Sequence, residues 1–149
     1  MKRDFVTRLV YASKIPLIGR LAYLALKVLG IELPRSVTIG DRLEIAHGGF
    51  GIVIHSKARI GDRVKIYPGV TLGRADIYKP AIESHFEGIV IEDDVILSPG
   101  CKVLCKQGIL TVGQGTVIGA NAVLLESTGE WEIWAGIPAK RVRKREPSR

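Results

Sequence analysis

The stretch that decides the fold falls into sixes: Ile54-His-Ser-Lys-Ala58-Arg, Ile60-Gly-Asp-Arg-Val64-Lys, Ile66-Tyr-Pro-Gly-Val70-Thr and Leu72-Gly73. An aliphatic residue opens each six, and a small or β-branched residue takes the fifth place. This period matches neither the alternation of a strand nor the 3.6-residue repeat of a helix. A prism satisfies it: short parallel strands form flat walls, the first-position side chains point inward, and tight turns form the corners.

The same register returns elsewhere in the chain. Further sixes begin at Ile39, Ile91, Leu97, Val112 and Ile118. Three sixes make one coil of the prism, so residues 31–140, without the non-repeating stretch 74–90, predict roughly five stacked coils. We therefore predict three segments: apolar and basic helices over residues 1–30, the repeat domain over 31–140, and a basic tail over 141–149.

Composition agrees with a packed domain rich in turns. Hydrophobic residues make up 46% and charged residues 25%, while glycine takes 17 of 149 positions and aromatic residues only 6%. The net charge of +7 suits an anionic partner, and charge alone does not choose between nucleic acid, a phosphate-rich cofactor and a lipid surface. No basic segment studded with aromatic residues supports nucleic-acid binding, and we expect none.

The first thirty residues carry a second pattern. Arg20 to Leu29 reads as a helix with Arg20 and Lys27 on one narrow stripe and apolar residues elsewhere, and Pro16 separates it from a shorter helix. The apolar runs are too short to cross a membrane. We expect these helices to pack on the prism or on a sister subunit, and shallow contact with a membrane stays open as the alternative.

The six-residue register breaks in three places, and irregular backbone in a repeat protein lies outside the wall, where function concentrates. The first break, between Ile45 and Ile54, contains His47 and three glycines. The second is a long excursion over residues 74–88 that contains His85. The third lies between Val103 and Val112.

Five segments carry a resemblance to a known family: Gly30–Pro34, His47–Ile54, Pro68–Gly73, Ile118–Val123 and Ala135–Val142. With them the chain resembles the hexapeptide-repeat acyltransferases, and most closely the serine acetyltransferases and the related O-acetyltransferases of polysaccharide biosynthesis. The resemblance implies an all-β fold, a left-handed parallel β-helix preceded by a short α-helical segment. It also implies a homotrimer with clefts between neighbouring prisms.

The resemblance further implies transfer of an acetyl group from acetyl-CoA to a hydroxyl group, with His47 as the general base. An imidazole suits this role because its pKa near 6.5 lets it accept a proton at neutral pH. His85 corresponds loosely to a second active-site histidine of the family, or is an exposed loop residue. The implied positions along the pantetheine arm of acetyl-CoA are Gly73, Ala120 and Gly136, and those at its phosphates are Lys140 and Arg141.

The sequence leaves open which molecule accepts the acetyl group. Serine acetyltransferases have an aspartate immediately before the catalytic histidine, whereas this chain has Ala46. The acceptor is therefore L-serine or a sugar of a capsular or exopolysaccharide or its precursor. A non-catalytic scaffold subunit is a more remote alternative.

Zinc binding is an alternative role for the histidines. His47, His55 and His85 would supply the three protein ligands of a zinc carbonic anhydrase built on the same prism. Those enzymes carry two histidines five residues apart, a pair that this chain lacks, so we expect no metal. Cys101 and Cys105 follow no secretory signal, and we expect two reduced thiols in a cytoplasmic protein, with peripheral contact at the inner membrane face still open.

Overall fold

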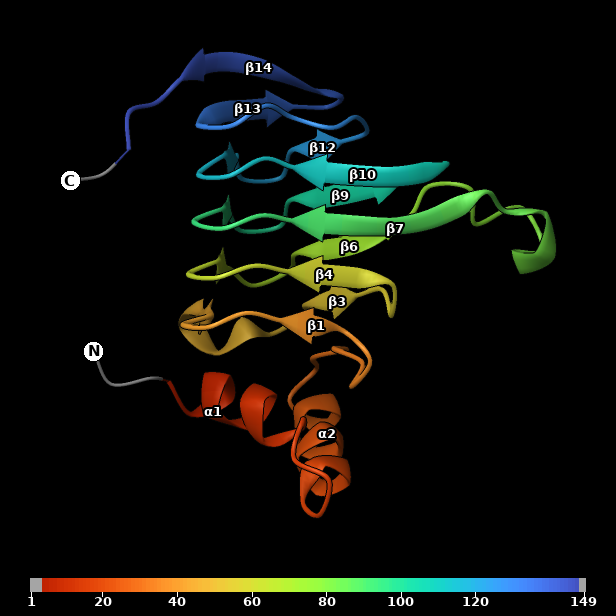
Figure 1. The fold of residues 1–149 in the computed structure, drawn as a ribbon, viewed down its shortest axis with the longest axis vertical. Helices are drawn as coiled ribbons and strands as arrows, with labels where there is room; N and C mark the ends of the chain where they lie inside the picture. The colour runs from red at the N-terminus through yellow and green to blue at the C-terminus, as the bar shows by residue number, and fades with distance from the viewer. Residues whose placement is uncertain (1–3, 148–149) are drawn as a thin grey trace.

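Short parallel strands stack into three flat walls in the computed structural model, which describes residues 4–147 (Figure 1). The first sheet has the order β1 (Thr38–Ile39), β4 (Ala58–Ile60), β7 (Phe86–Ile91) and β10 (Gly108–Val112). The second has β14 (Ala139–Lys144), β13 (Glu132–Gly136), β11 (Val117–Ile118), β8 (Ile96–Leu97), β5 (Lys65–Ile66) and β2 (Glu44–Ile45). The third has β12 (Val123–Leu124), β9 (Lys102–Cys105), β6 (Thr71–Arg74) and β3 (Val53–Ile54).

The chain visits the three sheets in turn, so β1 to β12 form four complete coils and β13 begins a fifth. In Figure 1 the strands of the first sheet run leftward in front, those of the third sheet run rightward behind, and the chain climbs from the N-terminus to the C-terminus. Seen from the C-terminal end, this path turns clockwise while approaching the viewer. The coil is therefore left-handed, which confirms the fold expected from the resemblance.

The interior is built from the repeat positions. The first-position residues Ile54, Ile60, Ile66 and Leu72 are at most 2% exposed, as are the fifth-position residues between them. Each coil places these side chains above those of the coil below, which makes one continuous aliphatic core. The six-residue period thus predicts the buried set because inward positions recur at a fixed place in every wall.

We number the corners by the sheets they join: the first corner joins the first and second sheets, the second corner joins the second and third, and the third corner joins the third and first. Side chains of the first corner tie one coil to the next. Carboxylate Oδ1 of Asp62 accepts a hydrogen bond from the backbone N–H of Asp41, and that of Asp93 accepts one from Asp62, at 2.7 and 2.8 Å. Arg63 forms a two-pronged ion pair with Asp94 at 2.6 and 2.9 Å.

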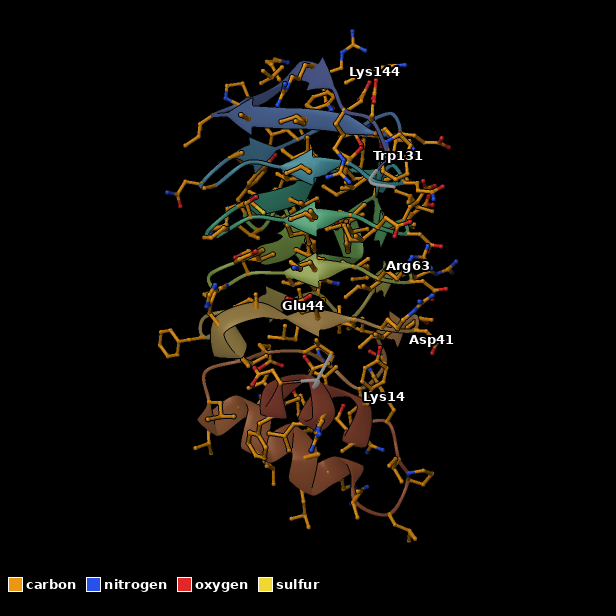
Figure 2. All side chains as sticks on the ribbon, turned by 90° about the vertical axis from the view of Figure 1, so that its left-hand side faces the viewer. Lys14, Asp41, Glu44, Arg63, Trp131 and Lys144 are labelled. Atoms are coloured by element: carbon orange, nitrogen blue, oxygen red, sulfur yellow. The ribbon has the colours of Figure 1, made fainter. Side chains whose placement is uncertain are left out.

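Figure 2 shows Asp41, Arg63 and Trp131 along this edge at successive heights. These hydrogen bonds and ion pairs engage Asp62, Asp93 and Asp94 in contacts between coils. The predicted catalytic residues His47 and His85 lie on the other two corners.

Two helices close the lower end of the prism (Figure 1). Helix α1 (Phe5–Ala12) begins at Asp4, whose side chain caps the N–H of Phe5, and α2 (Gly19–Val28) follows a turn that contains Pro16. The inward residues of α1 and α2, such as Val10 and Leu26, are fully buried. None of the described helices has the length and hydrophobicity needed to span a membrane.

An antiparallel hairpin closes the upper end. Strand β14 pairs with β13 and places Lys140 beside Ala135 and Lys144 beside Glu132. The carboxylate of Glu132, which is 6% exposed, accepts hydrogen bonds from the N–H of Gly129, the indole of Trp134 and the guanidinium of Arg141. Residues 141–144, predicted to belong to a basic tail, are therefore part of this hairpin.

Candidate functional site

His47 lies at the second corner of the first coil, in the turn η1 (Ala46–Gly49) between β2 and β3. Its backbone is left-handed, with φ 49° and ψ 37°, and Gly48, Gly49 and Gly51 follow with positive φ. Left-handed backbone is costly for a residue with a Cβ, so the three glycines let the chain turn sharply around one strained histidine. The imidazole is exposed, and its centroid lies 5.8 Å from the ring of Tyr67 one coil above.

Above His47 the second corner is a column of left-handed residues. Gly51, Gly69, Gly100 and Asn121 all have positive φ, and a Cβ on Gly69 would lie 3.4 Å from the Cα of Gly100. The ammonium of Lys102 fixes the middle of the column through hydrogen bonds of 2.7 Å to the carbonyls of Gly69 and Gly100. At its glycine positions this corner therefore presents backbone at close range.

Two of the predicted cofactor positions lie on this same corner. Ala120 is exposed three coils above His47, and Gly136 is exposed at the end of β13, next above β11. With strands spaced by about 4.8 Å, Ala120 lies about 14 Å above His47 along the prism. Gly73 lies apart from them, half-buried in β6 of the third sheet, where it pairs with Leu104.

The predicted phosphate-binding residues project from β14. Lys140 lies beside Ala135 at the upper end of the second corner, and its ammonium is 3.3 Å from Glu126. Both side chains of that pair are more than half exposed, so water screens the interaction and the cation remains available to an anion. Arg141 is partly engaged within the protein, because one of its guanidinium nitrogens lies 3.1 Å from a carboxylate oxygen of the buried Glu132.

The excursion between β6 and β7 leaves the prism at the third corner and is clasped at its base (Figure 1). Arg74 donates to the Asp76 carboxylate at 2.9 Å and to the backbone carbonyls of Asp76 and Lys79. A hydrogen bond from Ser84 and the Arg74 guanidinium hold the pKa of Asp76 below its usual range. The side chain of Asp76 is 2% exposed, so a buried carboxylate fixes a loop whose outer residues Ile77 and Ile82 stand in solvent.

His85 ends the excursion. Its side chain is exposed, while its carbonyl accepts a hydrogen bond from Gly108 at 2.7 Å, which ties the loop to the coil above. His55 lies one coil lower on the same corner, with its ring edge-on to Phe86 at 4.7 Å and its Nδ1 accepting from the N–H of Lys57. Burial, helped by the charges of Lys57 and Arg74, lowers the pKa of His55.

Within one chain, the two predicted catalytic residues, His47 and His85, do not lie close together. His47 lies on the second corner and His85 on the third, with a wall of the prism between them. The residues predicted for the cofactor divide in the same way, because Ala120, Gly136 and Lys140 share the corner of His47, whereas Gly73 lies on the wall that leads to His85.

The remaining candidates belong to the structure of the coil. Cys101 and Cys105 are free and buried, and burial raises the pKa of Cys101 to about 12, which leaves that thiol protonated at neutral pH. Among residues 4–147, no group of three or more histidine, cysteine, aspartate or glutamate side chains is arranged to hold a metal ion.

Sequence reasoning overlooked three residues beside the candidate site. Tyr67 directly follows β5 of the next coil and so faces His47. Phe86 begins β7, which pairs with β4, and contacts the ring of His55. Both could have been found by aligning successive coils and asking which side chains share a corner. Asp76 gave no such signal, because only the folded loop shows that its carboxylate is buried.

Serine acetyltransferases are among the known proteins with similar sequences. Those of Staphylococcus xylosus and Bacillus subtilis are 41% and 39% identical to the chain over 115 and 113 residues. The matches take in 77% and 76% of this chain but 49% and 48% of the relatives, so the chain spans about half the length of the curated relatives it matches. No model of a protein family matches the chain.

Solved structures agree on the fold. Serine acetyltransferase from Brucella abortus superimposes with a TM-score of 0.75 at 22% identity, over 95% of this chain and 57% of that one. The enzyme from Neisseria gonorrhoeae, solved in complex with serine, gives 0.73 at 25% identity, over 92% of this chain and 55% of that one. Sequence and fold together confirm the resemblance: the chain is a relative of the serine acetyltransferases, built on their left-handed hexapeptide-repeat coil.

Proposed function

We propose that the protein is an acetyl-CoA-dependent O-acetyltransferase of the serine acetyltransferase kind, with His47 as its general base. The observation that carries the proposal is the setting of His47. It is an exposed imidazole held in left-handed backbone among glycines, within a segment that resembles the catalytic segment of the family. Positive φ recurs at other corner residues such as Arg63 and Asn121, so the feature that singles out His47 is an exposed imidazole in the irregular, glycine-rich break of the repeat.

The chemistry follows from the acceptor. An alcohol is a weak nucleophile, so His47 takes its proton as the oxygen attacks the thioester carbonyl and forms the new C–O bond. Backbone N–H groups of the glycine-rich turn are the candidate donors to the oxyanion that develops. The C–S bond then breaks, the thiolate leaves, and the proton held by His47 returns to the sulfur. The products are an O-acetyl ester and free coenzyme A.

The second corner supports a binding path for the co-substrate. His47 lies at its foot, Ala120 and Gly136 leave its upper part open, and Lys140 and Arg141 lie at its top. An extended thioester whose reactive carbon lies near His47 would reach the basic strand β14 with its phosphates. A related serine acetyltransferase from Brucella abortus has been solved with coenzyme A, which supports the assignment of the co-substrate.

We propose further that the protein is a homotrimer and that each site is shared between two subunits. The second corner of one prism would face the third corner of its neighbour, so that the excursion with His85 completes the site around His47. The separation of the two histidines within one chain supports this arrangement.

Thiol release from acetyl-CoA tests the activity, with L-serine and a panel of sugars as acceptors. His47→Asn is the most informative variant because asparagine tolerates left-handed backbone and lacks the base. We expect it to lower turnover by about 10²–10⁴-fold while coenzyme A still binds. Arg42→Asn, at another left-handed position on the first corner, is the matched control and should retain full turnover.

Near-wild-type turnover of His47→Asn would overturn the role of His47. If no acceptor releases thiol and coenzyme A does not bind, the proposed activity is wrong and the alternative of a scaffold subunit is favoured.

Mixing subunits tests the shared site. His47→Asn and His85→Asn proteins are unfolded together, refolded together and assayed. If the two histidines of one site come from different subunits, some mixed trimers contain an intact site and activity returns. If both variants are inactive alone and the mixture stays as inactive, the site is not shared in this way. Full turnover of His85→Asn alone would show that His85 has no role.

A sugar acceptor is the second candidate, and Ala46 favours it. Serine acetyltransferases carry an aspartate at this position, and a neutral alanine removes one group that would hold an amino acid. Thiol release with a saccharide and not with serine would assign the protein to the polysaccharide branch.

A further inference from the structure

The lower end of the molecule carries an apolar face that no described part of the chain covers. Leu17 is 94% exposed, and Leu21, Leu24 and Val28 of α2 are 71%, 56% and 87% exposed. At about 100° per residue, the three helical members fall within an arc of about 60°. We call these four residues the outer stripe. It lies on the side of α2 opposite its buried residues Ala22 and Leu26, so α2 is apolar on two sides.

The charge around the outer stripe is mostly positive, and the flanking acidic residues Asp4 and Glu32 are engaged in capping α1 and in pairing with Lys27. Residues 5–31 contain Arg8, Lys14, Arg20 and Lys27 and no acidic residue. Lys27 is paired with Glu32 at 3.1 Å, and Lys14 donates to backbone carbonyls between the helices and the prism. No ion pair with a described residue engages Arg8 or Arg20. Arg20 precedes the stripe residue Leu21 and lies on its flank.

We propose that this end of the molecule docks on an anionic lipid surface, with the outer stripe at the boundary of the acyl chains and Arg8 and Arg20 among the headgroups. Apolar insertion and basic attraction together are what holds an amphipathic helix in the plane of a membrane interface. The helices form one end of the prism (Figure 1), and Figure 2 places Lys14 at this end and Lys144 at the other. Docking there leaves the three walls of the prism free.

A second copy related by a two-fold axis is another possible cover, and the charges disfavour it. A two-fold contact presses the same patch against itself, which would bring basic flanks together without an acidic partner in residues 5–31. An anionic surface neutralises those charges instead.

Flotation of the full-length protein with lipid vesicles tests the proposal. One set of vesicles is phosphatidylcholine alone, and the other contains roughly 30% phosphatidylglycerol. We expect at least about tenfold stronger partition onto the anionic vesicles, most of it lost at about 0.5 M salt. Arg20→Gln should weaken partition about fivefold, as removal of one basic residue near an anionic surface does.

The apolar part is tested by Leu21→Ser/Leu24→Ser, which we expect to lower partition by about tenfold or more. Leu125→Ser, an exposed leucine in the upper part of the prism, is the matched control and should float like the wild type. Circular dichroism and unfolding midpoints confirm that each variant is folded. Sedimentation velocity without lipid gives the mass of each.

Failure of the wild type to float, or equal flotation with both sets of vesicles, would overturn the proposal. So would a lower mass of Leu21→Ser/Leu24→Ser in solution, because the outer stripe would then be a subunit interface. The test needs no enzymatic activity and stands apart from the proposed function.

Discussion

Gly48 and Gly49 are neighbours beside His47, yet they have different reasons to be glycine. Both have positive φ, at 73° and 63°. A Cβ on Gly48 would meet nothing within 4 Å, whereas one on Gly49 would collide with the side chain of Ile45 and lie 2.9 Å from Cδ1 of Ile52. We expect Gly48→Ala to lower the free energy of unfolding by about 1–2 kcal/mol, the cost of left-handed backbone for a residue with a Cβ. Gly49→Ala should cost about 1–3 kcal/mol more, because it also overpacks the core.

Urea unfolding of the two variants measures the difference. Equal losses of stability would show that the corner shifts enough to make room for a side chain at Gly49.

His55 gives the coil a sensitivity to acid. Burial lowers its pKa, with help from Lys57 and Arg74, so below its ordinary value of about 6.5 the unfolded chain binds the proton more readily than the folded one. Stability that is present above this pH is therefore lost as the pH falls through it. We expect the free energy of unfolding to drop between about pH 7.5 and about pH 5.5 in the wild type, and to drop less in His55→Gln.

Urea unfolding at the two pH values checks this expectation. His85→Gln, which alters an exposed histidine of the same corner, should keep the wild-type pH dependence. If both variants behave alike, the acid sensitivity has another source.

Among the elements, the excursion depends most on a single group. Asp76→Asn removes the charge that opposes Arg74, whose side chain is 17% exposed, and so leaves a cation at the base of the loop without its partner. We expect the N–H groups of Ala75 and Gly108, which tie the loop to neighbouring strands, to exchange with solvent faster by on the order of tenfold.

Hydrogen exchange followed by mass spectrometry measures this loosening. Glu83→Gln, at an exposed carboxylate in the same loop, should leave the exchange rates unchanged. Unchanged rates in Asp76→Asn would mean that the hydrogen bonds of the loop ends hold it without the ion pair.

The same elements show how far the sequence predicts the fold. The walls were predictable because Ile60 and Ile66 hold fixed places in a six-residue period, and both are buried as expected. Ile77 and Ile82 are aliphatic too, but they are 82% and 93% exposed, because the excursion stands outside the prism and has no wall to pack on. The pairing of β14 was missed because a run of basic residues carries no strand period.

At the scale of the whole molecule, Glu132 holds the upper end together. Its burial would raise its pKa, but hydrogen bonds from Trp134, Gly129 and Arg141 outweigh this and hold the pKa below its usual range. Glu132→Ala leaves those donors without an acceptor, and we expect a loss of about 2–4 kcal/mol. In a stack of coils each layer contacts only its neighbours, so the loss should open β13 and β14 first.

Hydrogen exchange along the chain, together with urea unfolding, tests this cap. Glu126→Ala, which removes an exposed carboxylate near the same hairpin, should change stability by less than about 0.5 kcal/mol. Even loss of protection from β1 to β14 would show that the prism unfolds as one unit.

The sequence singles out candidate site residues one by one, but it does not show how they are arranged relative to one another. The break in the period located His47, since three glycines beside a histidine have no place in a wall. The sequence could not place His47 and His85 on different corners, because that depends on how many coils and which wall separate them. Their separation is a property of the folded prism, and it is what makes a neighbouring subunit necessary to the proposed site.

Because the base of the excursion is fixed by hydrogen bonds and an ion pair, the loop beyond it could be replaced by another loop. Both of its ends are bonded to strands that exist without it, through Ala75 to Cys105 and through Gly108 to His85. Evolution or a protein engineer could therefore exchange the residues between the clasp points without disturbing the register of the coils. Doubling the length of such a loop costs only about 0.6 kcal/mol in closure entropy. New acceptors could thus be recruited by grafting loops onto an unchanged prism.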